Sequence, residues 1–333
     1  MRPLDRSSYP DDAEVYAPEL LSVWLRHFPD AEPTQRDKED WVENAVFLQA
    51  FERTGVPFRV LGKNSGAFIS SISDTLATGQ GEKAFFHTGI SGRDHVEAPQ
   101  DLSFELQLPS HLSTIPRHAE LKTFKAAAGR DILFAAPEKD WIDEAIRTLV
   151  PGAGQFFIKT LKKEWAQRFE IEAGRSPWDQ MCEAQEGLEW SIIHLDGVDQ
   201  PYFSIQGIIE PWHEYRMFMV DHQPVTGAGC VEAFTPLDNE TTFDPKTERV
   251  RNSGDIETRP DLVDMFKGYA EKFGAALRNE IGPLPAYSLD LCVNALTGKI
   301  VPIELNPPLN LGRYASDVDA WVRAIDRQLG EAA

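Results

Sequence analysis

The clearest alternation of apolar and polar residues in this chain lies near its C-terminus, between residues 287 and 306. Apolar side chains recur at every second position in two runs, which is the pattern of β-strands with one buried face. The three residues at 296–298, which include a glycine, separate the runs and predict a short hairpin loop. Such a loop centres the pairing on position 297, so we expect Asp290 to lie opposite Glu304.

The two faces of this predicted hairpin differ in chemistry. Asp290, Glu304 and Asn306 share one face, because residues two apart on a strand point the same way. Opposed Cβ atoms lie about 4.5–5.5 Å apart, so the two carboxylates repel each other unless a cation joins them. Oxygen ligands suit Mg²⁺, with Mn²⁺ as an alternative, and we expect these three residues to bind such a metal. A solvated strand face is the other interpretation. The opposite face is expected to form core, through Leu289, Leu291, Val293, Val301, Ile303 and Leu305.

Weaker patterns along the rest of the chain predict a mixture of helices and antiparallel strands. Predicted helices cover 17–28, 34–54, 142–149, 262–277 and 318–329, and Thr34 and Asp37 resemble a capping box at the start of the second. Predicted strands cover 56–61, 132–136, 155–159, 203–209, 214–220 and 224–231. We therefore expect an α/β or α+β fold class with substantial antiparallel sheet.

Lysines near a predicted strand end form a second candidate group. Lys159 follows the apolar run 156–158, so it directs a compact cation to the edge of a site, where lysine is a good partner for phosphate. The other interpretation is a lysine whose aliphatic stem covers apolar surface while its ammonium stays in water. Lys163, Lys125 and Lys122 are further phosphate-binding candidates.

A short segment that joins two predicted strands forms a third candidate group. Its residues are Gly207, Ile208, Ile209 and Glu210. A connector of this kind can offer backbone N–H and C=O groups to the edge of an adenine ring while apolar side chains hold its faces. Glu214 follows where a carboxylate can accept ribose hydroxyls, and Arg216 shares its strand face. A Glu–Arg pair at the surface is the other interpretation.

Arg313, in the loop that follows the predicted hairpin, is a fourth candidate. An arginine there could hold a substrate carboxylate or an acyl phosphate, because its planar fork matches such anions. An exposed surface charge is the other interpretation. The histidines show no metal-ligand spacing, and we expect His213 and His222 at the surface or in turns.

Composition narrows the classes of function. The 333 residues carry a formal net charge of −20, which argues against nonspecific binding to nucleic acid or adhesion to an anionic membrane. The sequence shows no apolar run of membrane-spanning length and no apolar signal core at its start. The three cysteines, at 182, 230 and 292, have no paired spacing, so we expect a cytoplasmic location.

The order of these features resembles that of the ATP-grasp superfamily. The order is a strand lysine, a connector, a Glu-x-Arg strand, a long helix, an Asp strand and a Glu-x-Asn-Pro strand. The resemblance covers about residues 117–333. It implies two α+β lobes, at 117–210 and 211–333, which clasp ATP and follow a smaller α/β domain at 1–116. The chain departs from the family at Gly207, where an acidic residue is usual, and no glycine-rich flap is obvious.

The resemblance also implies an ATP-dependent carboxylate–amine ligase that works through an acyl phosphate. The metal at the hairpin would bridge the ATP phosphates, Lys159 and Arg216 would stabilise the transferred charge, and Arg313 would steady the acyl intermediate. The segment 160–200 is the candidate lid. Substrates would be a carboxylate and an amine on small molecules, peptides or protein tails. A phosphotransferase that acts on a hydroxyl and a non-catalytic nucleotide-binding module remain as alternatives, and neither the acceptor nor the oligomeric state follows from the sequence.

Overall fold

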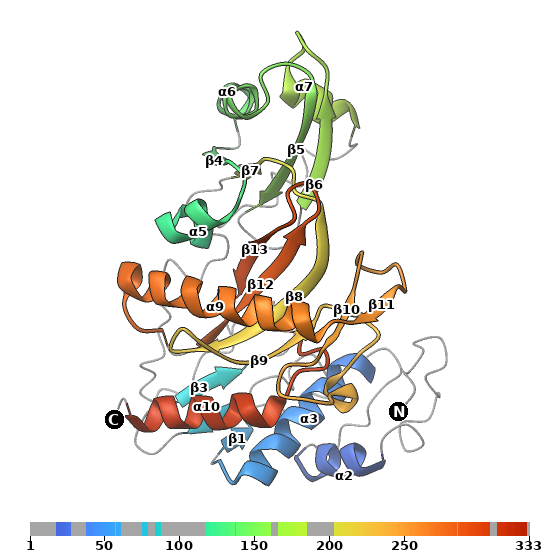
Figure 1. Ribbon diagram of the computed structural model, residues 1–333, viewed down its shortest axis with the longest axis vertical. Coiled ribbons are helices and arrows are strands. Elements are labelled where there is room, and N and C mark those ends of the chain that lie inside the picture. The colour runs from blue at the N-terminus through green and yellow to red at the C-terminus, as the bar shows by residue number, and fades with distance from the viewer. Residues whose placement is uncertain are drawn as a thin grey trace.

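The fold combines helices with antiparallel sheets. The computed structural model describes residues 18–27, 38–56, 58–60, 75–78, 84–87, 117–136, 138–160, 166–184, 203–284, 286–306 and 312–331. Within these residues every pairing between two strands is antiparallel, which confirms the α+β class. Two four-stranded sheets follow one another along the long axis of the molecule (Figure 1). We call them the upper sheet and the lower sheet after their places in that view.

The upper sheet has the strand order β4-β7-β5-β6. Phe156 and Ile158 of β5 are fully buried in one cluster with Ile142 and Ile146 of α6. Because successive side chains on a strand alternate between faces, Lys159 points away from that cluster. The elements of this unit are β4 (Ile132–Ala135), α6 (Lys139–Leu149), β5 (Gly154–Thr160), β6 (Ala166–Ile171), α7 (Pro177–Ala184) and β7 (Phe203–Gln206).

The lower sheet has the strand order β13-β12-β8-β9 and is buried on both faces. In β8, Met217 and Met219 pack in one cluster with helix α9, whereas Phe218 and Val220 pack in another. This alternation places Arg216 on the same face as Phe218. The elements are β8 (Pro211–Val220), β9 (Gln223–Gly229), α9 (Pro260–Ile281), β12 (Ala286–Asn294) and β13 (Lys299–Asn306).

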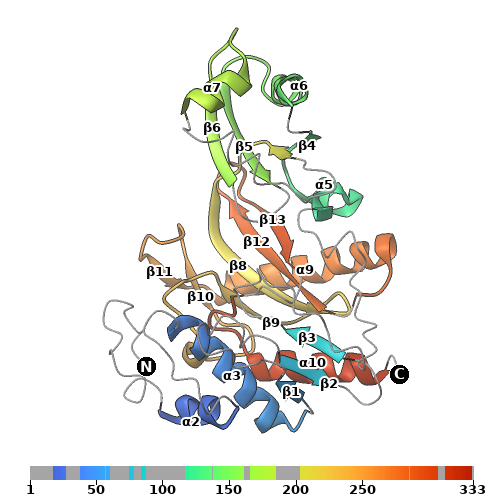
Figure 2. The same ribbon diagram turned by 180° about the vertical axis from the view of Figure 1, so that it is seen from behind.

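Helices from both ends of the chain pack together beneath the lower sheet (Figure 2). They are α2 (Pro18–His27), α3 (Lys38–Thr54) and α10 (Val318–Glu331). The Phe47 ring of α3 lies 5.9 Å from the Trp321 ring of α10, and the Phe218 ring lies 5.0 Å from Trp321. The N–H of Ala320 donates to Asp317, which caps the start of α10. The N-terminal helices thus share a core with the C-terminal helix, and the division at residues 116 and 210 stays a prediction.

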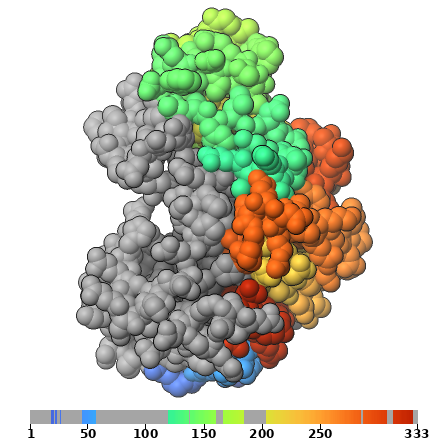
Figure 3. Space-filling model, turned by 90° about the vertical axis from the view of Figure 1, so that its left-hand side faces the viewer, coloured from blue at the N-terminus to red at the C-terminus, as the bar shows by residue number. Residues whose placement is uncertain are grey.

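Smaller elements surround the two large sheets. Helix α5 (Lys122–Ala127) lies against α9 (Figure 3), where the Glu280 carboxylate accepts hydrogen bonds from the N–H groups of Lys122 and Thr123, both at 2.8 Å. No helix among the described residues is long and apolar enough to cross a membrane. The remaining elements are β1 (Phe58–Val60), β2 (Thr75–Thr78), β3 (Ala84–His87), η4 (Arg117–Glu120), η5 (Pro236–Asp238), β10 (Lys246–Glu248) and β11 (Ile256–Thr258).

In the β12–β13 hairpin, the residue opposite Asp290 is the predicted one, but the length of the loop and the pairing near it differ from the prediction. Asp290 pairs with Glu304, as expected, whereas Leu291 pairs with Pro302. Ile303 is therefore an extra residue in β13, which makes a β-bulge. The strands end at Asn294 and resume at Lys299, so the loop has four residues and the predicted three-residue loop is wrong. The extra loop residue and the extra bulge residue cancel each other at Asp290.

The bulge also corrects part of the predicted core face. Leu289, Leu291 and Leu305 join the cluster under α9, as expected. Val301, however, pairs with Cys292 and so shares the face of Asp290, while Ile300 takes a place against the core cluster. Between the bulge and the loop, β13 is shifted by one residue relative to its predicted pairing with β12. A shift of one residue moves each side chain to the other face of the sheet.

Most predicted elements occur with boundaries shifted by a few residues. The strand predicted at 203–209 ends at Gln206, and the capping box at Thr34 and Asp37 lies outside the described residues. Within the candidate lid at 160–200, Thr160 ends β5, residues 166–184 include β6 and α7 of the upper unit, and 161–165 and 185–200 lie outside the described residues. The 166–171 run alternates weakly, with Phe169 and Ile171 buried, and this strand was missed.

Helix α9 contains two glycines in contrasting surroundings. A Cβ at Gly274 would overlap the carbonyl oxygen of His222, whereas a Cβ at Gly268 would have no described atom within 4 Å. We expect Gly274→Ala to lower the free energy of unfolding by about 1–3 kcal/mol, because the helix must move away from the β8–β9 turn. Gly268→Ala should raise it by about 0.5–1 kcal/mol, because alanine favours the helix. Urea unfolding of both variants tests this, and shifts of the same sign would contradict it.

Candidate functional site

A buried ion pair lies at the centre of the candidate site. Arg216 of β8 donates through Nε to Oδ1 of Asp290 at 2.8 Å and through Nη2 to Oδ2 at 2.7 Å. Both side chains are more than 90% buried. Burial alone would lower the pKa of Arg216, but the Asp290 carboxylate and its hydrogen bonds raise it well above its usual value. Arg216 also donates to the carbonyl oxygen of Gly312 at 3.0 Å, so it joins β12 to the loop after β13.

The three predicted metal ligands converge as the register requires. Nδ2 of Asn306 lies 2.9 Å from Oδ2 of Asp290 and 3.1 Å from Oε1 of Glu304. The Oδ1 atom of Asn306 is buried and has no hydrogen-bond partner among the described residues. An unpaired buried oxygen is unfavourable by about 1–3 kcal/mol, so this atom is available to a ligand that accepts its lone pair.

Lys159 brings the upper sheet to the same point. Its Nζ atom lies 2.6 Å from Oε2 of Glu304, and both side chains are about 85% buried. A predicted phosphate-binding lysine and a predicted metal ligand thus face each other from two sheets. Two groups that are far apart in the sequence thus meet in space, and their roles toward a nucleotide stay predictions.

Glu214 is a third carboxylate beside this centre. Burial raises its pKa, and the nearby carboxylates of Asp290 and Glu304 raise it further, while Arg251 acts in the opposite direction. Nη1 of Arg251 lies 3.7 Å from Glu214, and Nη2 lies 3.1 Å from Glu232. The structure therefore gathers negative charge here and balances it with arginines.

The connector between β7 and β8 is an extended segment at the junction of the two sheets. The N–H of Gly207 donates to Asp131, and the carbonyl oxygen of Glu210 accepts from Ala295. Ile208 and Ile209 between them are half-buried, and their backbone groups have no hydrogen bond within the described part of the chain. Within the described residues, their two N–H and two C=O groups are therefore open to a ligand on an apolar segment, which fits the predicted contact with a flat polar ring. The Glu210 side chain pairs with Arg168 at 2.8 Å.

Three other candidates lie away from the carboxylate centre or outside the description. Arg313 is 1% exposed, and its guanidinium lies 4.8 Å from the centroid of the Phe47 ring. It packs the loop after β13 onto α3, which corrects the expectation that it faces a substrate. Lys125 is exposed on α5 with its Nζ 5.5 Å from the centroid of the Phe134 ring, and Lys163 lies outside the described residues.

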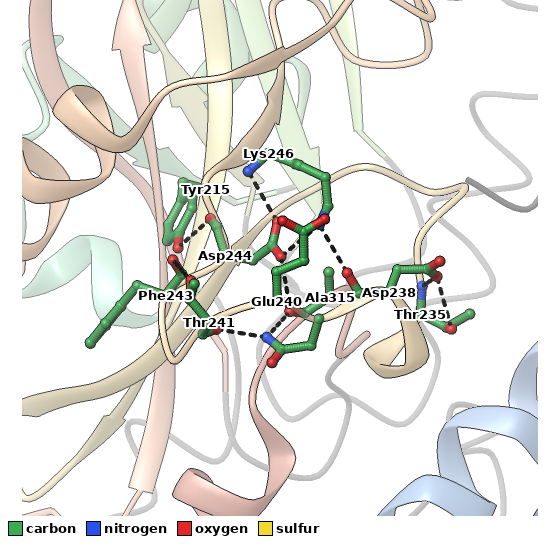
Figure 4. Close-up of polar contacts among 10 residues, drawn as sticks. Tyr215, Thr235, Asp238, Glu240, Thr241, Phe243, Asp244, Lys246 and Ala315 are labelled. Atoms are coloured by element: carbon green, nitrogen blue, oxygen red, sulfur yellow. Dashed lines mark hydrogen bonds and ion pairs between the residues drawn. The ribbon is translucent and has the colours of Figure 1, made fainter. Parts of the chain in front are cut away.

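A hydrogen-bonded loop between β9 and β10 supports the segment that follows the hairpin (Figure 4). Asp244 is fully buried, and its carboxylate accepts from Nζ of Lys246 at 2.9 Å and from the N–H of Lys246 at 3.0 Å. Asn239 of the same loop donates to the carbonyl oxygen of Ala315 at 2.6 Å. The loop thereby fixes the neighbouring Tyr314, whose ring centroid lies 5.3 Å from the Arg216 guanidinium.

Buried histidines and cysteines near the sheet have structural roles. His213 is 7% exposed with Nδ1 3.0 Å from Oγ1 of Thr247, and His222 is fully buried between Tyr287 and Gly282. His222 occupies the β8–β9 turn, which agrees with the expectation of a surface or turn residue. His213 is buried within β8, so that expectation is wrong for His213. Burial raises the pKa of Cys292 to about 12, so its thiol stays protonated at neutral pH.

The donor set at the hairpin fits a hard divalent cation. No group of three or more histidine, cysteine, aspartate or glutamate side chains with metal-binding geometry occurs among the described residues. The set here is instead two carboxylates and one carboxamide, whose unpaired Oδ1 supplies the third oxygen. Rotation of the Asn306 amide by about 180° would turn that oxygen toward Asp290 and Glu304, where Nδ2 lies now. Arg216 donates to both oxygens of Asp290, and Lys159 donates to Oε2 of Glu304.

Two site residues were missed by the sequence analysis. Arg251 lies in the turn between β10 and β11, where no periodic pattern marks a residue. Arg130 follows α5 and contacts both the upper sheet and β13. Neither contact leaves a signal in the sequence, because each joins segments far apart along the chain.

The fold and the site define a two-sheet α+β protein whose sheets meet at a carboxylate–carboxamide centre. No protein-family model matches the chain, and no curated protein matches it. Among solved structures it is similar to D-cycloserine synthetase DcsG (15% identity, TM-score 0.36, covering 61% of this chain and 66% of that one). It is also similar to ATP-grasp ligase PsnB complexed with minimal precursor, Mg and ADP (19% identity, TM-score 0.37, 66% and 61%).

A third similar structure is the D-alanine–D-alanine ligase from Bacillus anthracis complexed with ATP (11% identity, TM-score 0.39, covering 62% of this chain and 60% of that one). The chain spans less than two thirds of the length of all three proteins. Similarity at TM-scores this low assigns no role to any residue of this chain.

Proposed function

We propose that this protein is an ATP-dependent carboxylate–amine ligase of the ATP-grasp type. The observation that carries the proposal is the meeting of Asp290, Glu304 and Asn306 of the lower sheet with Lys159 of the upper sheet. A metal–nucleotide complex needs oxygen ligands for its metal and a cation for its phosphates, and this junction offers both.

Each residue around this centre would contact a different part of the metal–nucleotide complex. A Mg²⁺ ion held by Asp290, Glu304 and Asn306 would neutralise charge on the phosphates. Lys159 would contact the phosphates. Arg216 holds Asp290 in place through its bidentate pair and adds positive charge beside the transferred group.

The adenosine end would lie along the connector. The free backbone groups of Ile208 and Ile209 would pair with the adenine edge, and no acidic side chain is needed at Gly207 for that contact. Glu214 would accept the ribose hydroxyls. Its raised pKa reflects burial, and hydroxyl donors would relieve the unfavourable burial of its charge.

The proposed reaction has two steps. A substrate carboxylate attacks the γ-phosphoryl group, so that a carboxyl O–P bond forms, the P–O bond to ADP breaks and an acyl phosphate results. An amine nitrogen then attacks the acyl carbon, releases phosphate and gives up a proton, which leaves an amide. Arg251, which is 45% exposed beside Glu214, would approach the acyl group in the role first expected of Arg313.

Trapping with hydroxylamine tests the class of reaction. A panel of amino acids and peptides with Mg²⁺-ATP should release ADP, and added hydroxylamine should convert the acyl phosphate to a hydroxamate. A stable alkyl phosphate in place of the hydroxamate would instead establish a phosphotransferase. Tight binding of Mg²⁺-ATP with no ADP released across the panel would point to a binding module and would contradict the ligase.

A further inference from the structure

Arg130 joins the two sheets beside the candidate site. Its Nε atom donates to Oε1 of Gln206, the last residue of β7, at 2.8 Å. Its Nη1 atom donates to the carbonyl oxygen of Pro302 at 3.1 Å, and its Nη2 atom donates to that of Ile303 at 3.3 Å. A further bond, from Nη1 to the carbonyl oxygen of Ala128 at 3.1 Å, fixes the guanidinium to the end of α5.

This guanidinium is held by neutral acceptors. No carboxylate pairs with Arg130 among the described residues, and burial lowers its pKa to about 10. An unpaired, part-buried cation is unfavourable unless its hydrogen bonds are well satisfied. Four acceptors from three segments meet that requirement, so the position of each segment depends on the others.

The two β13 carbonyl oxygens that Arg130 binds belong to the bulge. If Ile303 paired regularly with Asp290 and did not form a bulge, the register near the loop would continue unchanged and would place Glu304 opposite Leu289. A slip of one residue moves a side chain to the other face, so Glu304 would point into the core under α9. The bulge is thus the feature that places Glu304 beside Asp290.

Gly129 allows Arg130 to approach the hairpin, and Gly207 of the connector lies on the other side of the arginine. A Cβ at Gly129 would lie 2.9 Å from Cγ1 of Val301, so only glycine admits this contact without a shift, and its φ of 64° also favours glycine. A Cβ at Gly207 would lie 3.5 Å from Cβ of Arg130. The arginine therefore lies between the connector and the bulge.

We propose that Arg130 is a positioning residue that holds the β13 bulge and so ties the orientation of Glu304 to the connector end of the upper sheet. The effect of Arg130 on metal binding rests on the proposed function, whereas the effect of Arg130 on the bulge does not. Arg130 makes no contact with Asp290, Glu304 or Asn306 and is not itself a metal ligand.

The test compares Arg130→Met and Arg130→Lys with Arg147→Met. Arg147 is an exposed arginine on α6 whose ion pair, within the described part of the chain, is with Asp143. Amide hydrogen exchange reports the bulge directly. We expect exchange in peptides that cover 299–306 to rise about tenfold in both Arg130 variants, while peptides from β8 and β9 exchange as in the parent protein. The Lys variant keeps the charge but cannot bridge the same acceptors, so it remains informative if the Met variant does not fold. Parent-like exchange in 299–306 in the folded variants would overturn the proposal.

Binding of Mn²⁺ in the presence of ADP, followed by electron paramagnetic resonance, reports the consequence for the metal. Residues that support metal ligands change affinity by about 10–100-fold, and we expect a loss in that range for the Arg130 variants and none for Arg147→Met. Parent-like affinity in the Arg130 variants would also overturn the proposal. If the parent protein binds no Mn²⁺ with ADP, the proposed function fails, and the exchange measurement still decides the role of Arg130.

Discussion

Replacement of Glu304 by Gln is expected to lower the rate of ADP formation by about 10³-fold or more. The carboxylate would hold the metal that neutralises the phosphates, and loss of such charge stabilisation has effects of this size. The amide keeps the shape of the side chain, and its oxygen can still accept from Lys159 while its NH2 group donates to the rotated carboxamide of Asn306, so the fold should persist. Steady-state ADP release with saturating Mg²⁺-ATP measures the effect.

A matched control is Glu257→Gln, which removes a half-exposed carboxylate of β11 that lies 3.5 Å from Arg259. It should leave both ADP release and stability unchanged. Urea unfolding of Glu304→Gln should give a midpoint close to that of the parent protein. ADP release at the parent rate from a folded Glu304→Gln variant would contradict the assignment of Glu304 to the metal.

Replacement of Arg216 by Met is expected to lower the free energy of unfolding by about 3–5 kcal/mol. The change leaves the Asp290 carboxylate buried without its bidentate partner, and removal of one member of a buried pair has effects of this size. The double variant Arg216→Met, Asp290→Asn should recover most of the loss, because it removes the buried charge as well. Urea unfolding of the single and double variants measures both effects.

Added Mg²⁺ should also rescue part of the stability of Arg216→Met, because a bound cation would compensate Asp290. The same concentration should stabilise the parent protein less. Arg278→Met provides the control, since its pair with Asp221 is half-exposed and should contribute less than about 1 kcal/mol. A single variant as stable as the parent, or a double variant no better than the single, would refute the view that Arg216 compensates a buried carboxylate.

The alternation of apolar and polar residues predicted which side chains share the site. It did not predict the β-bulge that positions them. The face shared by Asp290, Glu304 and Asn306 followed from the period of a strand. The bulge at Ile303 did not follow, because Arg130 binds it from a distant part of the sequence. The predicted pairing of Asp290 with Glu304 was right only because the loop is one residue longer than predicted and the bulge adds one residue to β13. These two differences cancel at Asp290.

Arg313 and the candidate lid show a second limit. A loop arginine next to metal ligands has the same sequence signature whether it faces a substrate or an aromatic ring, and here the ring of Phe47 comes from the other end of the chain. In the segment 166–184, strand β6 gains its stability from pairing with β5 and not from a strong pattern of its own. Contacts between distant segments decide both cases.

A crystal structure with Mn²⁺ and a nonhydrolysable ATP analogue tests the central claim most directly. The account predicts an anomalous peak bonded to oxygens of Asp290, Glu304 and Asn306, with phosphates between the metal and Lys159 and the adenine against Ile208 and Ile209. A metal bound elsewhere, with Glu304 still paired to Lys159 and no nucleotide between the two sheets, would contradict it.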